Sequence, residues 1–287
     1  MGIHDRDYAR PNRRGGFGGM KRKKWSVTTW LIIICVGIYM IDPFLKHFLV
    51  EWLYLSTDHA ILSFQYWRFI GFQFLHANFQ HLLFNMIGLF FFGPLVEQYL
   101  GGKRYLAFYL LCGIFGAVLY LILNLGGHIF GNDIPGLLFN DTATRLVGAS
   151  AGVFGILLAG AFLAPNIKVL LFFFIPMRLS TLAYSLVAIA LFTVLFGRNN
   201  AGGEAAHLGG AASGWYFIRH PHHLNGFFDF LGKVDPTSEH FAWREKKRTQ
   251  VDIDRILDKI HKKGLQSLSS KEKKILHKAS RKGREDS

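Results

Sequence analysis

The sequence contains few charged residues for its length. Asp, Glu, Lys and Arg make up 18% of its 287 residues, whereas soluble domains contain about 25%. The shortage lies in the middle of the chain: residues 26–218 hold eight basic and seven acidic side chains, while residues 1–25 and 219–287 carry net charges of +6 and +7. So long a section with so few charges cannot form a water-facing surface. A soluble enzyme with a nucleic-acid-binding face is therefore excluded, despite the net charge of +14.

Cysteine is also scarce. The two cysteines, Cys35 and Cys112, both lie inside apolar runs, which excludes a scaffold held together by disulfides. Hydrophobic residues, in contrast, make up 51% of the chain. Together these features indicate an integral membrane protein.

Apolar segments long enough to cross a bilayer occur six times. A transmembrane helix needs about 20 mostly apolar residues, and six segments approach that length: 26–45, 78–96, 105–125, 146–164, 179–197 and 201–218. The first follows the basic run 21–24 and has no small-residue cleavage site behind it, so we interpret it as an uncleaved span. The sequence predicts an all-α membrane protein with six transmembrane helices.

The tails indicate the orientation. An even number of spans places both termini on one side, and the excess of Lys and Arg in both tails assigns that side to the cytosol. We divide the chain into a basic tail (1–25) that we expect to be disordered, a membrane domain (26–219) and a basic cytosolic tail (220–287). The aromatic stretch 46–77 is expected to lie in the outer interface, and the proline-bracketed stretch 165–178 to form an inner interfacial loop.

Polar residues inside spans are costly and are therefore functional candidates. The candidates lie in or next to the second, fourth and sixth spans, all of which run from outside to inside: His76, His81, Asn85, Ser150 and His207. Ser150 is expected about four residues into its span and His207 about six. Both would lie roughly 6–9 Å below the outer edge.

Helical phase tests whether these side chains meet. His81 and Asn85 are four positions apart and share a face, whereas the phase places His76 roughly 140° away from His81. Gly210 and Gly214 share the face of His207. A stripe of small residues lets a neighbouring helix approach closely.

The simplest packing places the fourth and sixth spans backbone to backbone. Ser150 Oγ would then lie within hydrogen-bond distance of the His207 ring, and Phe154 could stack on that ring. A serine beside a histidine forms a nucleophile with a general base. The Asn85 amide, a His81 N–H and the Ser150 backbone N–H could stabilise an oxyanion.

A third, acidic member of the site is not assigned. Glu204 lies one turn before His207 but is expected nearer the outer surface. No cysteine or carboxylate accompanies the histidines in a way that would suggest a metal site, and no cofactor is expected.

These residues resemble the rhomboid family of intramembrane serine proteases, of the bacterial six-helix type with a C-terminal cytosolic extension. The resemblance covers about residues 26–219. It is carried by Trp67-Arg68, His76-x4-His81-x3-Asn85, Glu97, Gly148-Ala149-Ser150-Ala151-Gly152 and Ala206-His207-Leu208-Gly209-Gly210-x3-Gly214.

The resemblance implies a Ser150–His207 dyad, an oxyanion site at His81 and Asn85, and structural roles for His76, Arg68 and Glu97. It implies transmembrane proteins as substrates, cut in or beside a membrane-spanning helix near the outer face of a bacterial inner membrane. Phe154 stands where the family often has tyrosine. The partners would be these substrates and the lipid bilayer, with no nucleic acid; the oligomeric state is left open.

Other interpretations remain for the same residues. Ser150 and the glycines would serve helix packing alone, His207 could bond to backbone, and His81 and Asn85 could join helices. At the level of function, the alternatives are a catalytically silent relative that binds membrane-protein clients and a transporter.

The C-terminal tail has a helical pattern. Ile253, Ile256, Leu257 and Ile260 form one apolar face, and Ser269-x-x-Glu272 matches a capping box. We predict a small helical hairpin at 250–282, with a regulatory or partner-docking role as a hypothesis.

Overall fold

The computed structural model describes residues 25–131, 134–137, 139–171, 175–196 and 200–227, together with Ile256, Lys259, Ile260, Leu268, Ser269 and Glu272. Within these residues, the longer helices are α1 (Val27–Ile41), α4 (Phe79–Leu100), α5 (Gly102–Phe130), α6 (Ser150–Leu163), α7 (Leu179–Phe196) and α8 (Ala201–Arg219). The shorter segments between α1 and α4 are η3 (Asp42–Leu45), α2 (Phe48–Leu53), η4 (Asp58–Leu62), α3 (Arg68–Gly71) and η5 (Phe72–Phe74), and η6 (Pro221–Leu224) follows α8.

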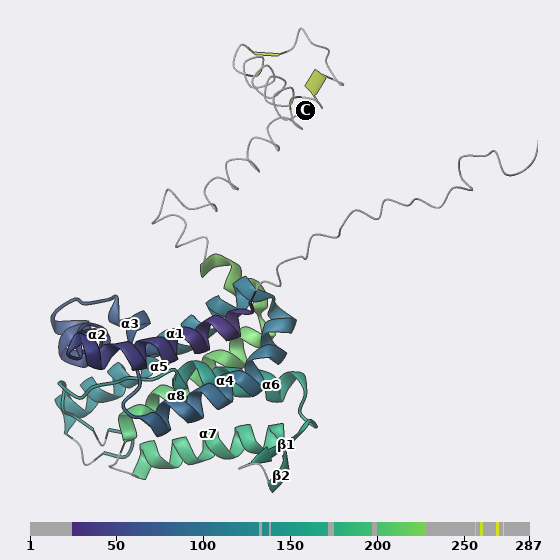
Figure 1. Ribbon diagram of the computed structural model, residues 1–287. Coiled ribbons are helices and arrows are strands. Elements are labelled where there is room, and N and C mark those ends of the chain that lie inside the picture. The colour runs from purple at the N-terminus through teal and green to yellow at the C-terminus, as the bar shows by residue number, and fades with distance from the viewer. Residues whose placement is uncertain are drawn as a thin grey trace, which may run out of the picture.

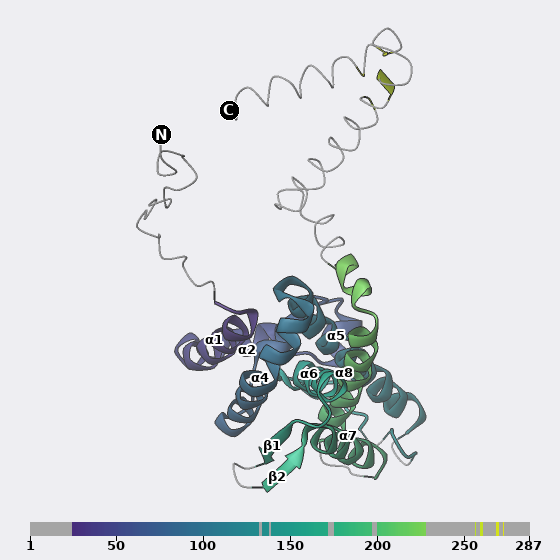
Figure 2. The same ribbon diagram turned by 90° about the vertical axis from the view of Figure 1, so that its right-hand side faces the viewer.

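Helices α6 and α8 form the centre of the bundle. Figures 1 and 2 show them surrounded by α1, α4, α5 and α7, and α8 makes its most extensive contacts with α5 and α6. The main hydrophobic core joins side chains of α1, α4, α5, α6 and α8, for example Cys35, Leu89, Phe108 and Ile156, all fully buried. The polar candidates are thus held by the best-packed part of the molecule.

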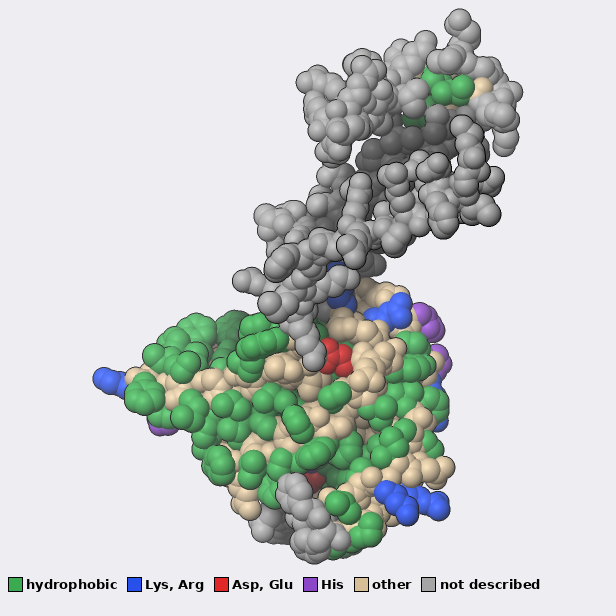
Figure 3. Space-filling view, turned by 45° about the vertical axis from the view of Figure 1, so that its right-hand side comes forward, with side chains coloured by type: hydrophobic (Ala, Val, Ile, Leu, Met, Phe, Trp, Pro, Cys, Tyr) green, Lys and Arg blue, Asp and Glu red, His purple; other side chains and the backbone are tan. Residues whose placement is uncertain are grey.

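The surface of the bundle is apolar, as a lipid-facing surface must be. Large hydrophobic side chains are exposed on the outer helices, including Phe90 on α4, Ile122 on α5 and Phe192 on α7. Figure 3 shows apolar side chains covering much of one flank, with the visible Lys and Arg side chains near its margins.

Four helical segments are long and apolar enough to cross a membrane: Val27–Leu45, Phe79–Leu100, Gly102–Phe130 and Leu179–Phe196. The other two expected spans differ in a physical way. Helix α6 has 14 residues and rises only about 21 Å. Helix α8 has 19 residues, but Gly, Ala and polar side chains lower its hydropathy. The structure supports a mostly helical membrane protein, and the count of six spans remains a prediction.

One predicted loop contains strands instead. The stretch 165–178, expected to be a loop, contains an antiparallel pair of strands, β1 (Lys168–Leu171) and β2 (Ile175–Arg178), with Lys168 opposite Arg178. The description of the fold as all-α therefore needs this correction. The β-branched and bulky apolar residues of the stretch suit a paired strand, and Leu179 N–H donates to the Ile167 carbonyl where the hairpin joins α7.

The stretch 46–77 is organised by a buried arginine. Arg68 Nη1 donates to the carbonyls of Glu51 (2.9 Å) and Tyr54 (2.7 Å), and its Nε donates to Gln65 Oε1 (2.7 Å). Burial lowers the pKa of Arg68, while Tyr54 and Glu51 oppose that shift. One guanidinium thus ties three points of the segment together, consistent with the structural role expected for Arg68.

In the C-terminal tail, the structure describes only parts of the predicted hairpin. The Ser269 N–H donates to Glu272 Oε2 (2.8 Å) and the Glu272 N–H to Ser269 Oγ (3.3 Å), which is the reciprocal pattern of the predicted capping box. Lys259 Nζ donates to the same carboxylate at 2.8 Å. These bonds lower the pKa of Glu272 to about 2. The remainder of the predicted hairpin and the tail 1–24 lie outside the described residues.

Candidate active site

Ser150 is the first residue of α6, not the fourth residue of a longer helix as predicted. The helix begins late because Gly148 has a φ of +136°, a conformation that glycine adopts without strain. Its N–H donates to the Phe72 carbonyl at 2.9 Å. A side chain at Gly148 would also come within 2.8 Å of the His81 ring and 3.4 Å of Ser150 Oγ. Gly148 therefore allows His81 and Ser150 to lie close together.

The two central groups are in direct contact. His207 Nε2 lies 2.8 Å from Ser150 Oγ, across 57 residues of sequence. The Phe154 ring is stacked on the imidazole with ring centroids 4.2 Å apart and an interplanar angle of 9°. The side chain of His207 is 16% exposed. The sequence predicted both contacts, and the stacked ring fixes the plane in which the imidazole nitrogens point.

The opposite nitrogen of the same ring has an acidic partner. His207 Nδ1 lies 2.8 Å from Glu204 Oε2, and the Glu204 side chain is 21% exposed. Glu204 was not expected to join the site, because it lies one turn nearer the outer end of the helix; the 2.8 Å contact with His207 differs from that expectation. Side chains on a helix lean towards its N-terminus, and residues three apart share a face. The ring of His207 therefore leans towards the long Glu204 side chain.

Close helix packing makes the Ser150–His207 contact possible. A Cβ at Gly210 would overlap the Ala151 backbone, and one at Gly214 would overlap the Gly155 backbone. The predicted backbone-to-backbone packing of α6 and α8 is thus present, and only glycine fits at these two positions.

On α4, Asn78 caps the helix and sets its start. Asn78 Oδ1 accepts from the His81 N–H (2.9 Å), and the buried Asn85 donates through Nδ2 to the His81 carbonyl (2.9 Å). His81 faces Gly148, beside Ser150. No bond from Asn85 to Ser150 or His207 occurs among the described residues. Of the two side chains predicted as oxyanion donors, His81 is the one seen next to Ser150.

His76 lies in the loop before α4. The prediction that it points away from His81 was wrong, because the phase argument assumed a helix that in fact begins at Phe79. The two rings meet edge to face with centroids 5.2 Å apart. Both ring nitrogens of His76 are buried without a hydrogen-bond partner among the described residues.

Glu97 has a structural position at the other end of α4. Its carboxylate accepts from the N–H groups of Val27 (2.7 Å) and Thr28 (3.0 Å) and from Thr28 Oγ1 (2.7 Å). These are the free amides at the start of α1, which need an acceptor. The sequence pattern did not reveal this partner, since 69 residues separate Thr28 from Glu97.

Two further features delimit the site. Among the described residues, no group of three His, Cys, Asp or Glu side chains could hold a metal ion.

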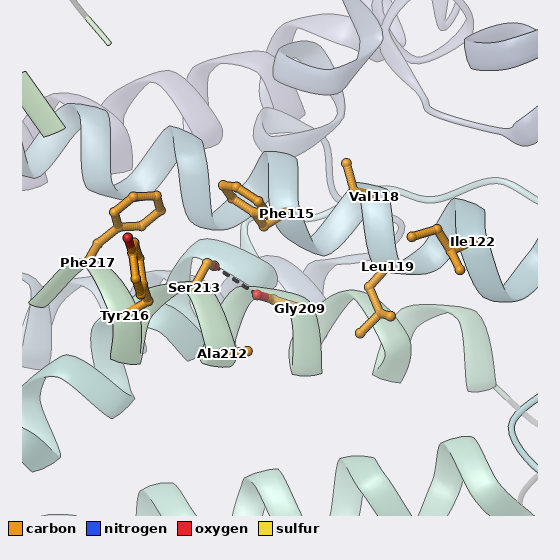
Figure 4. A pocket seen from close by; sticks show the side chains of 9 residues that line it. All are labelled: Phe115, Val118, Leu119, Ile122, Gly209, Ala212, Ser213, Tyr216 and Phe217. Carbon is orange, nitrogen blue, oxygen red and sulfur yellow. Dashed lines mark hydrogen bonds between the residues drawn. The ribbon is translucent and has the colours of Figure 1, made fainter. Parts of the chain in front are cut away.

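A separate groove of about 370 Å³ lies between α5 and α8, lined by Phe115, Val118, Leu119, Ile122, Gly209, Ala212, Ser213, Tyr216 and Phe217. Figure 4 shows that Ser213, the polar side chain in its middle, bonds back to Gly209 of its own helix. The groove therefore offers apolar contact and none of the polar residues described above.

Comparison with known proteins provides a further finding. The chain is 30% identical over 208 residues to RHOMBOID-like protein 12, mitochondrial, of Arabidopsis thaliana, covering 68% of this chain and 61% of that protein. It is 32% identical over 161 residues to rhomboid protease AarA of Providencia stuartii (53% and 55% covered). It is also 30% identical over 94 residues to rhomboid protease GlpG of Salmonella choleraesuis (32% and 34%). In each case the match spans less than two thirds of the relative's length.

Two family models match separate parts of the chain. Residues 240–282 match a family of unknown function (DUF6576). Residues 63–220 match the rhomboid domain, and this range contains every residue described at the site, from Arg68 to Gly214. The match covers more than half of the chain, and the chain belongs to the rhomboid family.

Proposed function

We propose that this protein is an intramembrane serine endopeptidase that hydrolyses peptide bonds in or beside the transmembrane segments of other membrane proteins. The observation that carries the proposal is the 2.8 Å contact between Ser150 Oγ and His207 Nε2, which joins two closely packed helices at the centre of the bundle. Polar side chains inside a membrane-spanning bundle are costly to bury and are therefore functional candidates. Membership of the rhomboid family and similarity to proteins named rhomboid protease support the same activity.

In the proposed reaction, Ser150 Oγ attacks the substrate carbonyl carbon as its proton passes to His207 Nε2. The new C–O bond converts the carbonyl into an oxyanion. His207 then returns the proton to the leaving amine as the C–N bond breaks, which leaves an acyl-enzyme. Water, deprotonated by the same nitrogen, releases the second product and restores the serine.

Donors for the oxyanion are available beside Ser150. The first amides of an α-helix have no carbonyl partner within the helix, and Ser150 is the first residue of α6. Its own N–H and the adjacent His81 ring are the donors that we assign, with Asn85 holding the α4 backbone at His81. Each well-placed donor contributes about 2.7–4 kcal/mol to transition-state stability in such sites.

The short α6 supports a site that water can reach. A helix rising about 21 Å is shorter than a hydrocarbon layer of roughly 30 Å, and residues 147–149 before it are not helical. We therefore place its first residue below the outer edge of the membrane. Substrate helices would have to unwind locally to present a peptide bond there. We further propose six spans, cytosolic termini and a bacterial inner membrane, with Ser150 towards the outer face.

The test uses the purified full-length protein in liposomes with a fluorescently labelled model membrane substrate. We expect cleavage that falls by at least about 10⁴-fold in Ser150→Ala and in His207→Ala. A fluorophosphonate should label the wild type at Ser150 and leave Ser150→Ala unlabelled. Cleavage that persists in Ser150→Ala would exclude this nucleophile, and a wild type that neither cleaves nor labels would favour a client-binding relative.

A further inference from the structure

The contact between Glu204 and His207 extends the site beyond the two residues that the family resemblance implies. His207 has two ring nitrogens, and each lies 2.8 Å from one partner: Nε2 from Ser150 Oγ and Nδ1 from Glu204 Oε2. The three groups therefore form a continuous chain from hydroxyl through imidazole to carboxylate.

The chemistry of the carboxylate decides the direction of both bonds. An ionised carboxylate can only accept hydrogen bonds, so His207 Nδ1 must carry the proton. In a neutral imidazole the other nitrogen, Nε2, then has the free lone pair. That lone pair faces Ser150 Oγ, which is the tautomer that a general base needs.

Glu204 lies at the start of its helix and has one side-chain partner among the described residues. It lies in the first turn of α8, where the positive end of the helix dipole stabilises negative charge. Among the described residues, His207 is the only side chain that bonds to its carboxylate. No nearby Lys or Arg competes for it in the part of the chain that the structure describes.

We propose that Glu204 is a positioning residue for the proposed proteolysis and completes a Ser150–His207–Glu204 triad. This proposal rests on the proposed function. Glu204 holds the His207 tautomer and stabilises the imidazolium that forms when the Ser150 proton moves to Nε2. It does not take the proton itself, and it touches neither the substrate nor the serine.

The first test is Glu204→Gln in the liposome cleavage assay. The amide of glutamine can donate to Nδ1 and so hold the opposite tautomer. We expect kcat to fall about 10²–10³-fold with KM nearly unchanged. This is less than the roughly 10⁴-fold loss found for the equivalent change at fully buried triads, because a partly exposed site lets water replace the carboxylate.

The pH profile separates positioning from a general structural role. The carboxylate stabilises the positive charge that the His207 ring gains when it takes the serine proton. Removing it should move the rising limb of kcat/KM to lower pH, whereas a purely structural defect would lower the plateau and leave the limb in place. Among the described residues, His81 also interacts electrostatically with His207, so the profile is repeated in a His81→Asn background, where the same shift is expected.

Two further variants make the outcome decisive. Glu204→Asp keeps the negative charge, so we expect the rising limb of its kcat/KM profile to stay at the wild-type pH while kcat is only partly reduced. If Glu204→Gln fails to fold, Glu204→Asp is the variant to compare with the wild type. Glu51→Gln is the matched control, because Glu51 pairs with Arg145 at 2.7 Å and is half exposed outside the site; it should cleave as the wild type does.

The result that would overturn the triad is distinct from failure of the protease assignment. Suppose that the wild type cleaves, that Ser150→Ala does not, and that Glu204→Gln retains activity within about threefold. If the rising limb of the kcat/KM profile of Glu204→Gln also stays in place, Glu204 has no positioning role and the Ser150–His207 dyad alone suffices. If the wild type itself shows neither cleavage nor labelling of Ser150, the proposed function fails first.

Discussion

Helices α7 and α8 have nearly the same length but opposite relations to the bundle. Of the 19 residues of α8, eleven are buried, whereas only four of the 18 residues of α7 are. Helix α8 packs through glycine and alanine against the backbones of α5 and α6, while α7 exposes large side chains such as Ile189 and Phe192. The difference shows that small residues, which lower hydropathy, provide the close contact on which the site depends.

The difference in packing between α7 and α8 has a physical cause. Lipid tails are as apolar as leucine, so burying a large side chain between membrane helices gains little over leaving it in lipid. Close backbone approach gains dispersion contacts and fixes distances. A helix that must hold a 2.8 Å hydrogen bond to its neighbour therefore benefits from glycine, whereas a peripheral helix does not need it.

Of the substitutions that test the packing of α8, Gly210→Ala should have the largest effect on cleavage and stability. Its added Cβ would overlap the Ala151 backbone, next to Ser150, and push α8 away from α6. Because a misplacement of about 1 Å can cost 10²-fold in rate, we expect cleavage to fall at least that far. Stability should fall by about 1–3 kcal/mol. Both are measured by liposome cleavage and by unfolding in detergent.

The matched control is Gly37→Ala in α1, where a Cβ would meet nothing within 4 Å. It should leave cleavage unchanged and stabilise the protein by a few tenths of a kcal/mol up to about 1 kcal/mol. Equal losses from both substitutions would contradict the importance of close packing between α6 and α8.

Ile156→Ala tests how firmly the central helix α6 is packed, because it leaves a cavity where the isoleucine side chain was. Ile156 on α6 is fully buried, and its truncation should cost about 1–3 kcal/mol, near the low end for buried isoleucine because lipid rather than water solvates the unfolded chain. The same substitution at Ile189 on α7, which is 59% exposed, should cost less than about 0.5 kcal/mol. Comparable losses in unfolding measurements would show that α7 is packed as firmly as α6.

Glu97→Gln should have a smaller effect than Gly210→Ala or Ile156→Ala. It weakens the three bonds to Val27 and Thr28 at the start of α1, and loss of a helix cap costs about 1 kcal/mol. Cleavage should stay within about twofold, since Glu97 lies roughly 18 Å along α4 from Asn85. A double-mutant cycle with Thr28→Val isolates the bond; a tenfold loss of activity would assign Glu97 a role beyond structure.

Much of the site could be predicted from the sequence because it is encoded locally. The glycines at 148, 210 and 214 and the spacing of His81 and Asn85 are visible in single segments. Contacts that depend on where a helix begins could not be predicted. His76 was misplaced because the start of α4 was unknown, and the hairpin at 168–178 was missed because its strands are short and apolar.

The sequence by itself determined that the chain lies in a membrane, which segments are helical, and that a serine and a histidine are candidates for catalysis, because composition and periodicity reflect the solvent around each segment. Only the tertiary structure decided that the Glu204 carboxylate bonds to His207 and that Glu97 holds the start of α1. Hydrogen bonds form over about 3 Å, and such distances follow from how helices start, lean and pack, which no single segment of sequence records.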